Sequence, residues 1–408
     1  MSLIINDLKR KPFLGNIEIG EVWLGSVKIY PEIIIIKHYE ELTSSGYYHD
    51  LVKVAQNRIL FGTRAGVKYY NPTTKVFTNS NLTTGAWARF VEAVDGNIYV
   101  IGYNIGSQSG LQKYSGGFTA VTLPATASFH NYINAVDGNT YLLSSSSGIQ
   151  KIDSNGVISL TTMTAGQYNF VFNSELYNKT FFVGNTTGIK YINTAVSDDI
   201  LATNITSGKG ANSMIEYDGK LFAFYDSGVR VWDDLNEQFT AVTATSGLYL
   251  TGIIASDGEL YVGTNATGVK KYDKTTNAFV NTNLTTGSFR EAFNGVNGIT
   301  YFPTTAATST LYYLNNGTLA TTGITSTTQR IKYVGDIGEY SYFTGANCWY
   351  RIHINSLPTD ITKTVDFNGN TPFRIEEIDG MFYVTSYLYD WFNGYENVTN
   401  YAGVGQVF

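Results

Sequence analysis

Short runs of alternating apolar and polar residues, separated by Asp-Gly or Asn-Gly pairs, recur along this chain roughly every 40 residues. The clearest copy is DGELYVGTNATGVKKYDKTTNAFVN at 257–281, and a close echo, QNRILFGTRAGVKYYNPTTKVFTNSN, lies at 56–81. Alternation predicts half-buried strands, and Asp-Gly between such runs indicates a tight hairpin in which both turn residues tolerate positive φ. Each unit therefore predicts a four-stranded antiparallel meander.

Nine such units can be counted, and one meander cannot bury both faces of its own sheet. Four-stranded units of this length stack radially, and no window shows the 3.6-residue apolar spacing of a helical repeat. The sequence predicts an all-β fold: a single β-propeller of about nine four-stranded blades, preceded by a small N-terminal β-hairpin. The alternative is eight blades with extra strands, because the last unit has a possible fourth strand of its own at 395–401.

The first residues do not follow the repeat, and we expect two parts: an N-terminal hairpin module at 1–31 and the propeller at 32–408. Apolar runs flank Gly25-Ser26, a pair suited to a two-residue hairpin turn, and Pro31 ends the second run. A lone hairpin is marginally stable in water, so it is expected to dock on the propeller or on another protein. The expected anchoring residues are Trp23, Leu24, Ile29 and Tyr30.

Residues 33–42, IIIIKHYEEL, precede LTSSG as the fourth strands of the best repeats precede NLTTG. We therefore expect 33–42 to form the outer strand of the last blade, beside 379–408. Pairing the two ends of the chain in this way would close the ring and remove a free sheet edge.

Charge and rare residues narrow the function. The net charge of −6 gives no positive electrostatic field that would attract nucleic acid. The single cysteine, Cys348, excludes an intrachain disulfide and a Cys-based zinc site. The four His residues stand in different units without the spacing of metal ligands, so no metal, cofactor or catalytic residue is predicted. The N-terminal run predicts neither a signal peptide nor membrane insertion.

Two sets of side chains recur at fixed places in the repeat and are candidates for ligand binding. Aromatic residues follow the loops that enter each new blade and could ring the mouth of the central channel, or else pack between blades; they are Tyr48, Trp87, Phe129, Tyr168, Tyr249, Phe289 and Phe373. Long cations lie two residues past the glycine that opens the third strand and could bind an acidic polysaccharide, or else be solvated; they are Lys68, Lys190, Arg230 and Lys270.

The repeat DGELYVGT followed by GVKKYD resembles the propeller repeats of two-component-regulator sensor domains, D-x-x-G-x-L-W-I-G-T-x-x-G-L-x-x-Y-D, over residues 47–401. The segment IEIGEVWLGSVKIYP at 17–31 resembles the short opening module of bacteriophage tail and virion-associated proteins. That second resemblance implies attachment of the chain to a particle, with the remainder facing outward.

Together these features predict a non-enzymatic bacteriophage virion protein, made in the host cytoplasm, whose propeller serves in host-surface attachment. Its expected partners are other virion proteins, through residues 1–31, and a host-surface glycan or protein. One alternative is a virion assembly or decoration protein whose propeller binds only other virion proteins. A second is a bacterial carbohydrate-binding or sensor propeller.

Overall fold

The computed structural model describes residues 48–366 with short gaps, together with isolated strands nearer both ends of the chain. The gaps lie at 56, 64–65, 75, 84–85, 104–109, 125–128, 145–147, 164–165, 194–199, 208, 245–246, 306–307, 327–329, 338 and 346–347. Throughout this part of the chain the secondary structure is strand and turn, without a helix. Accordingly, it contains no helix that could span a membrane.

The strands pair in chain order into four-stranded antiparallel sheets, each named here after its first strand. The first four sheets are β6 (Tyr48–Ala55), β7 (Arg58–Thr63), β8 (Gly66–Asn71) and β9 (Val76–Asn79); β10 (Ala86–Glu92), β11 (Ile98–Tyr103), β12 (Gly110–Tyr114) and β13 (Phe118–Ala120); β14 (Phe129–Asn134), β15 (Thr140–Ser144), β16 (Ile149–Ile152) and β17 (Ile158–Leu160); and β18 (Tyr168–Ser174), β19 (Lys179–Gly184), β20 (Ile189–Asn193) and β21 (Leu201–Ala202).

Four further sheets follow along the chain. They are β22 (Ser213–Tyr217), β23 (Lys220–Tyr225), β24 (Gly228–Asp233) and β25 (Gln238–Ala244); β26 (Tyr249–Ile254), β27 (Leu260–Thr264), β28 (Val269–Asp273) and β29 (Ala278–Asn281); β30 (Phe293–Asn294), β31 (Thr300–Pro303), β32 (Ser309–Asn315) and β33 (Thr318–Ser326); and β34 (Lys332–Ile337), β35 (Tyr340–Gly345), β36 (Cys348–His353) and β37 (Thr362–Asp366). The β22 and β26 sheets are joined, because β25 pairs with β29 in parallel at Thr243–Ala278 and Ala244–Phe279.

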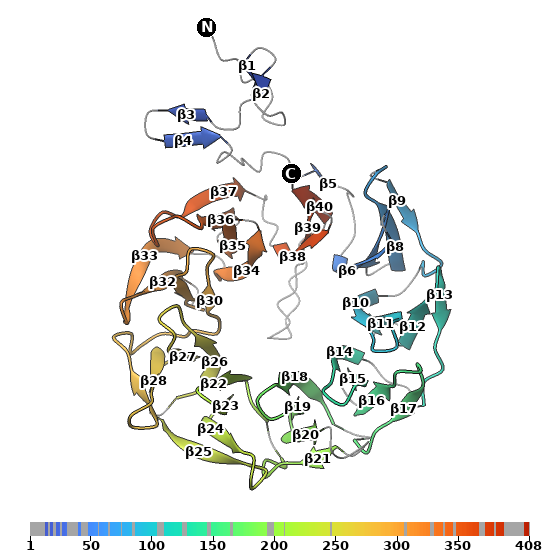
Figure 1. The fold of residues 1–408 in the computed structure, drawn as a ribbon, viewed down its shortest axis with the longest axis horizontal. Coiled ribbons are helices and arrows are strands. Elements are labelled where there is room, and N and C mark those ends of the chain that lie inside the picture. Colours follow the sequence, from blue (N-terminus) through green and yellow to red (C-terminus); the bar gives the residue numbers. More distant parts are fainter. Residues whose placement is uncertain are drawn as a thin grey trace.

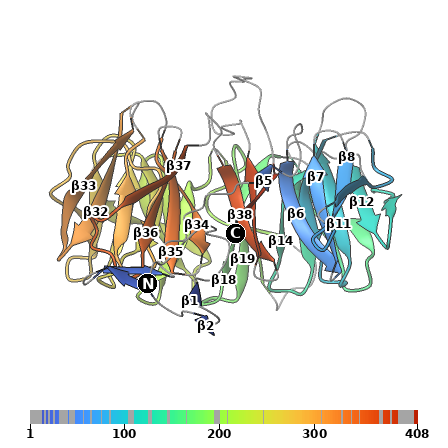
Figure 2. The same cartoon turned by 90° about the horizontal axis from the view of Figure 1, so that it is seen from above.

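The sheets follow one another around a ring, with the first strand of each nearest the centre (Figure 1). Figure 2 views the ring edge-on, and in it the sheets stand next to one another. This is the all-β, propeller-like arrangement that the repeat predicts.

The sheet between β37 and β6 brings both ends of the chain together (Figure 1). It consists of β38 (Pro372–Ile378), β39 (Met381–Ser386), β40 (Val404–Val407) and β5 (Glu40–Glu41). β5 pairs with β40 through Glu41–Gly405 and Glu40–Gln406. Of residues 33–42, which are expected to pair with the last sheet, the structure describes only Glu40 and Glu41; closure by the whole segment stays a prediction.

Four short strands precede this sheet and lie outside the ring in Figure 1: β1 (Phe13–Leu14), β2 (Ile17–Glu18), β3 (Val22–Leu24) and β4 (Val27–Tyr30). β1 pairs with β2, and β3 pairs with β4 in the register Leu24–Val27 and Trp23–Lys28.

The Asp-Gly turns correct one detail of the sequence prediction, because most of them are three-residue loops. Gly96 has φ 75°, its N–H donates to the Ala93 carbonyl (3.0 Å), and the Ala93 N–H donates to the Asn97 carbonyl (3.0 Å). A type I turn followed by a left-handed glycine has this pattern, so only the glycine needs positive φ. Asp218 and Gly219, at φ 52° and 69°, form the expected two-residue turn.

The core lies between neighbouring sheets rather than in one centre. Between the β18 and β22 sheets, for example, the ring centroids of Phe181 and Trp232 are 5.1 Å apart in an edge-on contact. Tyr191 joins the same cluster, and all three side chains are at most 2% exposed. Each sheet therefore needs a neighbour to bury its faces.

Candidate functional site

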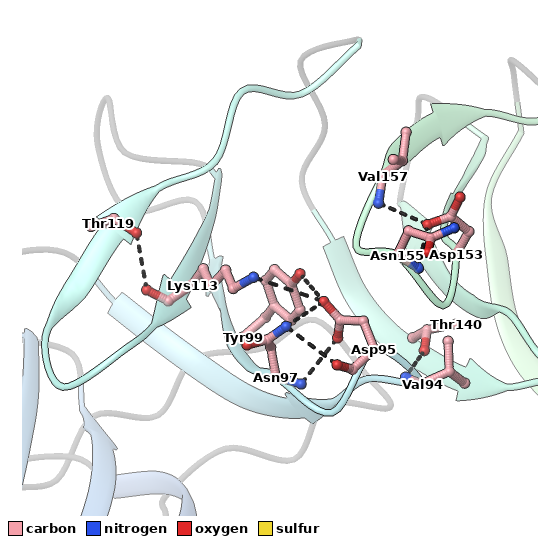
Figure 3. A network of polar contacts seen from close by, with 10 residues as sticks. All are labelled: Val94, Asp95, Asn97, Tyr99, Lys113, Thr119, Thr140, Asp153, Asn155 and Val157. Atoms are coloured by element: carbon pink, nitrogen blue, oxygen red, sulfur yellow. Dashed lines mark hydrogen bonds and ion pairs between the residues drawn. The ribbon is translucent and has the colours of Figure 1, made fainter.

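Polar residues that recur in several repeats form hydrogen bonds within a sheet and between neighbouring sheets. In the Asp-Gly loops, the hydroxyl of Tyr99 donates to Oδ2 of Asp95 (2.7 Å) (Figure 3). Asp137 and Asp257 receive the same bond from the tyrosine four residues later, at 2.7 and 2.8 Å. Burial opposes ionisation of Asp95, but the hydrogen bonds from Tyr99 and Asn97 outweigh it and lower the pKa of Asp95.

A second recurring group connects each loop to the following sheet. The Val94 N–H donates to Oγ1 of Thr140 (2.9 Å), as Figure 3 shows, and this hydroxyl donates to Oδ1 of Asn134 (2.7 Å). The amide of Asn134 in turn donates to the Glu92 carbonyl (3.0 Å), which lies on the same sheet as Val94. We call this series of hydrogen bonds, from a backbone N–H to a Thr hydroxyl, to an Asn side chain and on to a backbone carbonyl, the relay. The relay recurs with Thr180 and Asn173, and with Thr300 and Asn294.

A third group explains the asparagine of the NLTTG motif. The side chain of Asn283 accepts from the Leu319 N–H (2.9 Å) and donates to the Leu319 carbonyl (2.8 Å) on the outer strand of the next sheet. Asn81 and Asn204 make the same pair of bonds to Phe118 and Phe239. The recurring residues are therefore structural, and functional residues are to be sought where the copies differ.

The copies differ on the inner strands, just past a β-bulge. The register shifts between Tyr48 and Asp50 in β6, between Trp87 and Arg89 in β10, and between Phe129 and Asn131 in β14. The residue two positions past the aromatic is thus an acid, a base and an amide in three successive sheets. At the same place β18 has Phe170 and β26 has Thr251.

These three positions line a pocket of about 450 Å³, which we call the inner-wall pocket. Its lining residues are Asp50, Leu51, Val52, Arg89, Phe90, Glu92, Asn131 and Tyr132, from β6, β10 and β14.

Hydrogen bonds hold several of these side chains in place across the sheets. Asp50 is 5% exposed, and its carboxylate accepts from the N–H of Leu51 (3.0 Å) and from the N–H of Phe90 on the next sheet (2.9 Å). The guanidinium of Arg89 donates to Oδ1 of Asn131, again on the following sheet. Charged groups bonded in this way are strong and oriented hydrogen-bonding partners. The pocket is therefore a preformed polar surface.

The surroundings also shift the titration of two neighbouring groups. Burial, and then the negative charge of Asp50, raises the pKa of Tyr132, so this phenol stays protonated at neutral pH. Burial lowers the pKa of His130, and the nearby Arg89 charge adds to this, while Nε2 lies 2.6 Å from the Tyr168 carbonyl. Neutral His130 thus bonds the β14 sheet to the β18 sheet.

A related acid, Glu291, lies two residues before β30 and bonds to β34. Oε1 of Glu291 accepts from the Tyr333 N–H (3.1 Å), much as Asp50 accepts from Phe90. Burial raises the pKa of Glu291 to about 7. No group of three or more metal-ligating side chains occurs among the residues that the structure describes.

The aromatic residues predicted to bind a ligand are packed where their side chains are described. Phe129, Tyr168 and Tyr249 have no exposed surface, and Phe289 is 1% exposed. They belong to the clusters between sheets, so a ligand could reach their rings only if the sheets moved apart. Tyr48, Trp87 and Phe373 lie outside the described side chains, and ligand binding by this set stays a prediction.

The predicted basic residues lie on four separate sheets, on the third strands β8, β20, β24 and β28, away from the inner strands (Figure 1). Lys68, Lys190 and Arg230 are partly exposed. Lys270 is only 3% exposed, its ammonium group donates to Asn281, and burial lowers its pKa. Lys270 is therefore neither well solvated nor accessible to a polysaccharide. Binding of an acidic ligand by the four residues stays a prediction.

The anchoring residues Trp23, Leu24, Ile29 and Tyr30 lie on β3 and β4, and their side chains lie outside the described residues. Sequence reasoning did not select Asp50, Arg89, Glu92, Asn131 or Tyr132. The signal in the sequence was that Asp50, Arg89 and Asn131 differ between repeat copies at one position, two residues past the selected aromatic residues.

No family model matches the chain, and no curated protein matches it. Among solved structures, it is similar to the computationally designed Ika8 protein (11% identity, TM-score 0.48, covering 90% of this chain and 99% of that one). The extracellular domain of a hybrid two-component system from B. thetaiotaomicron is 15% identical, with TM-score 0.33, over 86% of this chain and 57% of that one. Virginiamycin B lyase from Staphylococcus aureus is 12% identical, with TM-score 0.42, over 85% and 94%.

These structures include a designed protein, a sensor domain and an enzyme, and the TM-scores are all below 0.5. The fold assignment rests on the sheets of the chain itself. No function follows from these likenesses.

Proposed function

We propose that the chain is a non-enzymatic bacteriophage virion protein in which a nine-bladed propeller serves in attachment to the host surface. The observation that carries this proposal is the segment at 17–31, whose resemblance to virion opening modules covers both β3 and β4. Residues 1–31 would join other virion proteins, and the propeller would face outward.

The inner-wall pocket supports binding as the role of the propeller. Arg89 is partly exposed and is held by a hydrogen bond across sheets, so it can contact a ligand without first being ordered. Several copies of the chain on one particle would multiply weak single contacts into a useful avidity. Attachment then needs no single tight site.

Affinity capture from the native source tests the virion role. The full-length chain is compared with a version that lacks residues 1–31, and the captured proteins are identified by mass spectrometry. Capsid or tail proteins recovered only with the full-length chain are the expected result. Recovery of the same virion proteins by both versions would favour an assembly or decoration role for the propeller, and recovery by neither would refute a virion role.

A further inference from the structure

The chemistry of the inner-wall pocket specifies what kind of ligand it can take. Its apolar members and Asp50 contribute little surface, because Leu51, Val52, Phe90 and Asp50 are 6%, 7%, 4% and 5% exposed. The accessible lining is therefore polar, and an apolar ligand would bury little hydrocarbon there. A volume of about 450 Å³ lies within the range of about 300–1,000 Å³ that is usual for small-molecule sites.

The lining contains both acceptors and donors. The carboxylate of the exposed Glu92 only accepts hydrogen bonds, whereas the guanidinium of Arg89 only donates. The bond to Asn131 employs one of the five N–H groups of Arg89. Tyr132 contributes a protonated phenol, which can donate and accept, because burial and Asp50 raise its pKa.

This mixture disfavours ligands of a single charge. Two carboxylates and one guanidinium leave the lining with a net negative charge, so an acidic ligand would meet the exposed Glu92 at a cost. A multiply cationic ligand would meet the guanidinium of Arg89 in the same pocket. A ligand whose groups each donate and accept within a small volume fits both kinds of partner.

We propose that the inner-wall pocket binds an uncharged, hydroxyl-rich saccharide through Arg89, Glu92, Asn131 and Tyr132. This inference rests on the proposed attachment function and specifies its ligand class. It concerns a site separate from the cations of the third strands, for which an acidic polysaccharide stays a prediction.

Glu92 is the residue on which to test the proposal, because it is exposed at the pocket and its substitution leaves the bonds of Asp50 and Arg89 intact. The full-length chain is applied to an array of neutral hexose and N-acetylhexosamine oligosaccharides beside sialic-acid and uronic-acid counterparts. The strongest neutral saccharide is then titrated calorimetrically against wild type and Glu92→Gln. Glu175→Gln, an exposed acid on the turn after β18, is the control with the same change of charge.

We expect neutral saccharides to bind more tightly than acidic ones, and Glu92→Gln to weaken binding about ten-fold, the lower end of the effect of a charged hydrogen bond. Glu175→Gln should leave the affinity unchanged. The proposal is overturned if acidic saccharides bind best, if the two variants behave alike, or if no saccharide binds at millimolar concentration.

Binding to whole host cells separates this inference from the attachment function. Cells are treated with periodate, which destroys surface saccharides, or with protease. Loss of binding only after periodate supports a saccharide ligand. Loss only after protease overturns the saccharide inference while leaving attachment intact, and failure to bind untreated cells overturns attachment and, with it, the saccharide inference.

Discussion

The relay that connects neighbouring sheets predicts a measurable loss of stability when its hydroxyl is removed. Thr180 is fully buried, accepts from the Val136 N–H at 3.1 Å and donates to Oδ1 of Asn173 at 2.7 Å. Thr180→Val keeps the branched shape and the strand propensity but replaces the hydroxyl with a methyl group. The change therefore removes two hydrogen bonds with little change in volume.

The size of the effect follows from what each partner loses. Asn173 is exposed, so water can replace the hydroxyl at Oδ1. The Val136 N–H is partly buried and is left facing a methyl group, which costs about 1–3 kcal/mol. We expect Thr180→Val to lower the free energy of unfolding by about 2 kcal/mol. Thr140→Val and Thr300→Val, at the same place in other relays, should give similar values.

Urea denaturation of each variant at pH 7 measures this difference, provided that the slopes with urea agree. Thr78→Val, on the exposed face of β9, is the matched control and should change the free energy of unfolding by less than about 0.5 kcal/mol. Faster amide exchange at Val136 in Thr180→Val would locate the loss at this contact. A Thr180→Val variant as stable as Thr78→Val would refute the role of the relay.

Three further predictions concern other contacts between and within sheets. Gly268 and Gly258 both have positive φ, but a Cβ at Gly268 would lie 1.8 Å from a backbone oxygen, whereas a Cβ at Gly258 would meet nothing within 4 Å. In denaturation experiments Gly258→Ala should lower the free energy of unfolding by about 1 kcal/mol, and Gly268→Ala by at least about 3 kcal/mol. Because burial raises the pKa of Glu291 from 4.5 to about 7, the folded state holds a proton that the unfolded state releases between these pH values. The contribution of Glu291 to the free energy of unfolding should therefore fall as pH rises from 4.5 to 7. Glu291→Gln should lessen this fall, and equal pH profiles of stability for the variant and the wild type would contradict the prediction. Asn283→Asp places a carboxylate oxygen against the Leu319 carbonyl and should lower the unfolding free energy by about 2 kcal/mol, whereas an equally stable variant would show that the donor is not needed.

Much of the fold could be predicted because its signals are local. The alternation of apolar residues and the turn pairs mark the strands, and the repeat length implies radial stacking. The predicted type of most Asp-Gly turns was wrong, because a glycine with positive φ occurs in both two-residue and three-residue loops. In Asp95-Gly96 the choice is decided by the N–H of Ala93, which reaches the Asn97 carbonyl.

The candidate site could not be predicted, because it depends on contacts that no single repeat contains. Asp50, Arg89 and Asn131 lie about 40 residues apart and meet only when successive sheets stack. The bulges between Tyr48 and Asp50 and between Phe129 and Asn131 also interrupt the two-residue alternation. A rule that assigns faces by alternation therefore cannot say which of these side chains lines the pocket and which is packed.

The parallel pairing of β25 with β29 bears on how the ring can open. Most neighbouring sheets are held together by side chains, but here backbone bonds at Thr243 and Ala244 join two sheets into one. Residues of the β22 and β26 sheets should therefore lose amide protection together, as one cooperative unit. The two-residue pairing of β5 with β40 joins strands that are distant in the chain. Transient opening is thus expected to start at the chain ends, leaving the joined sheets as the last part of the ring to separate.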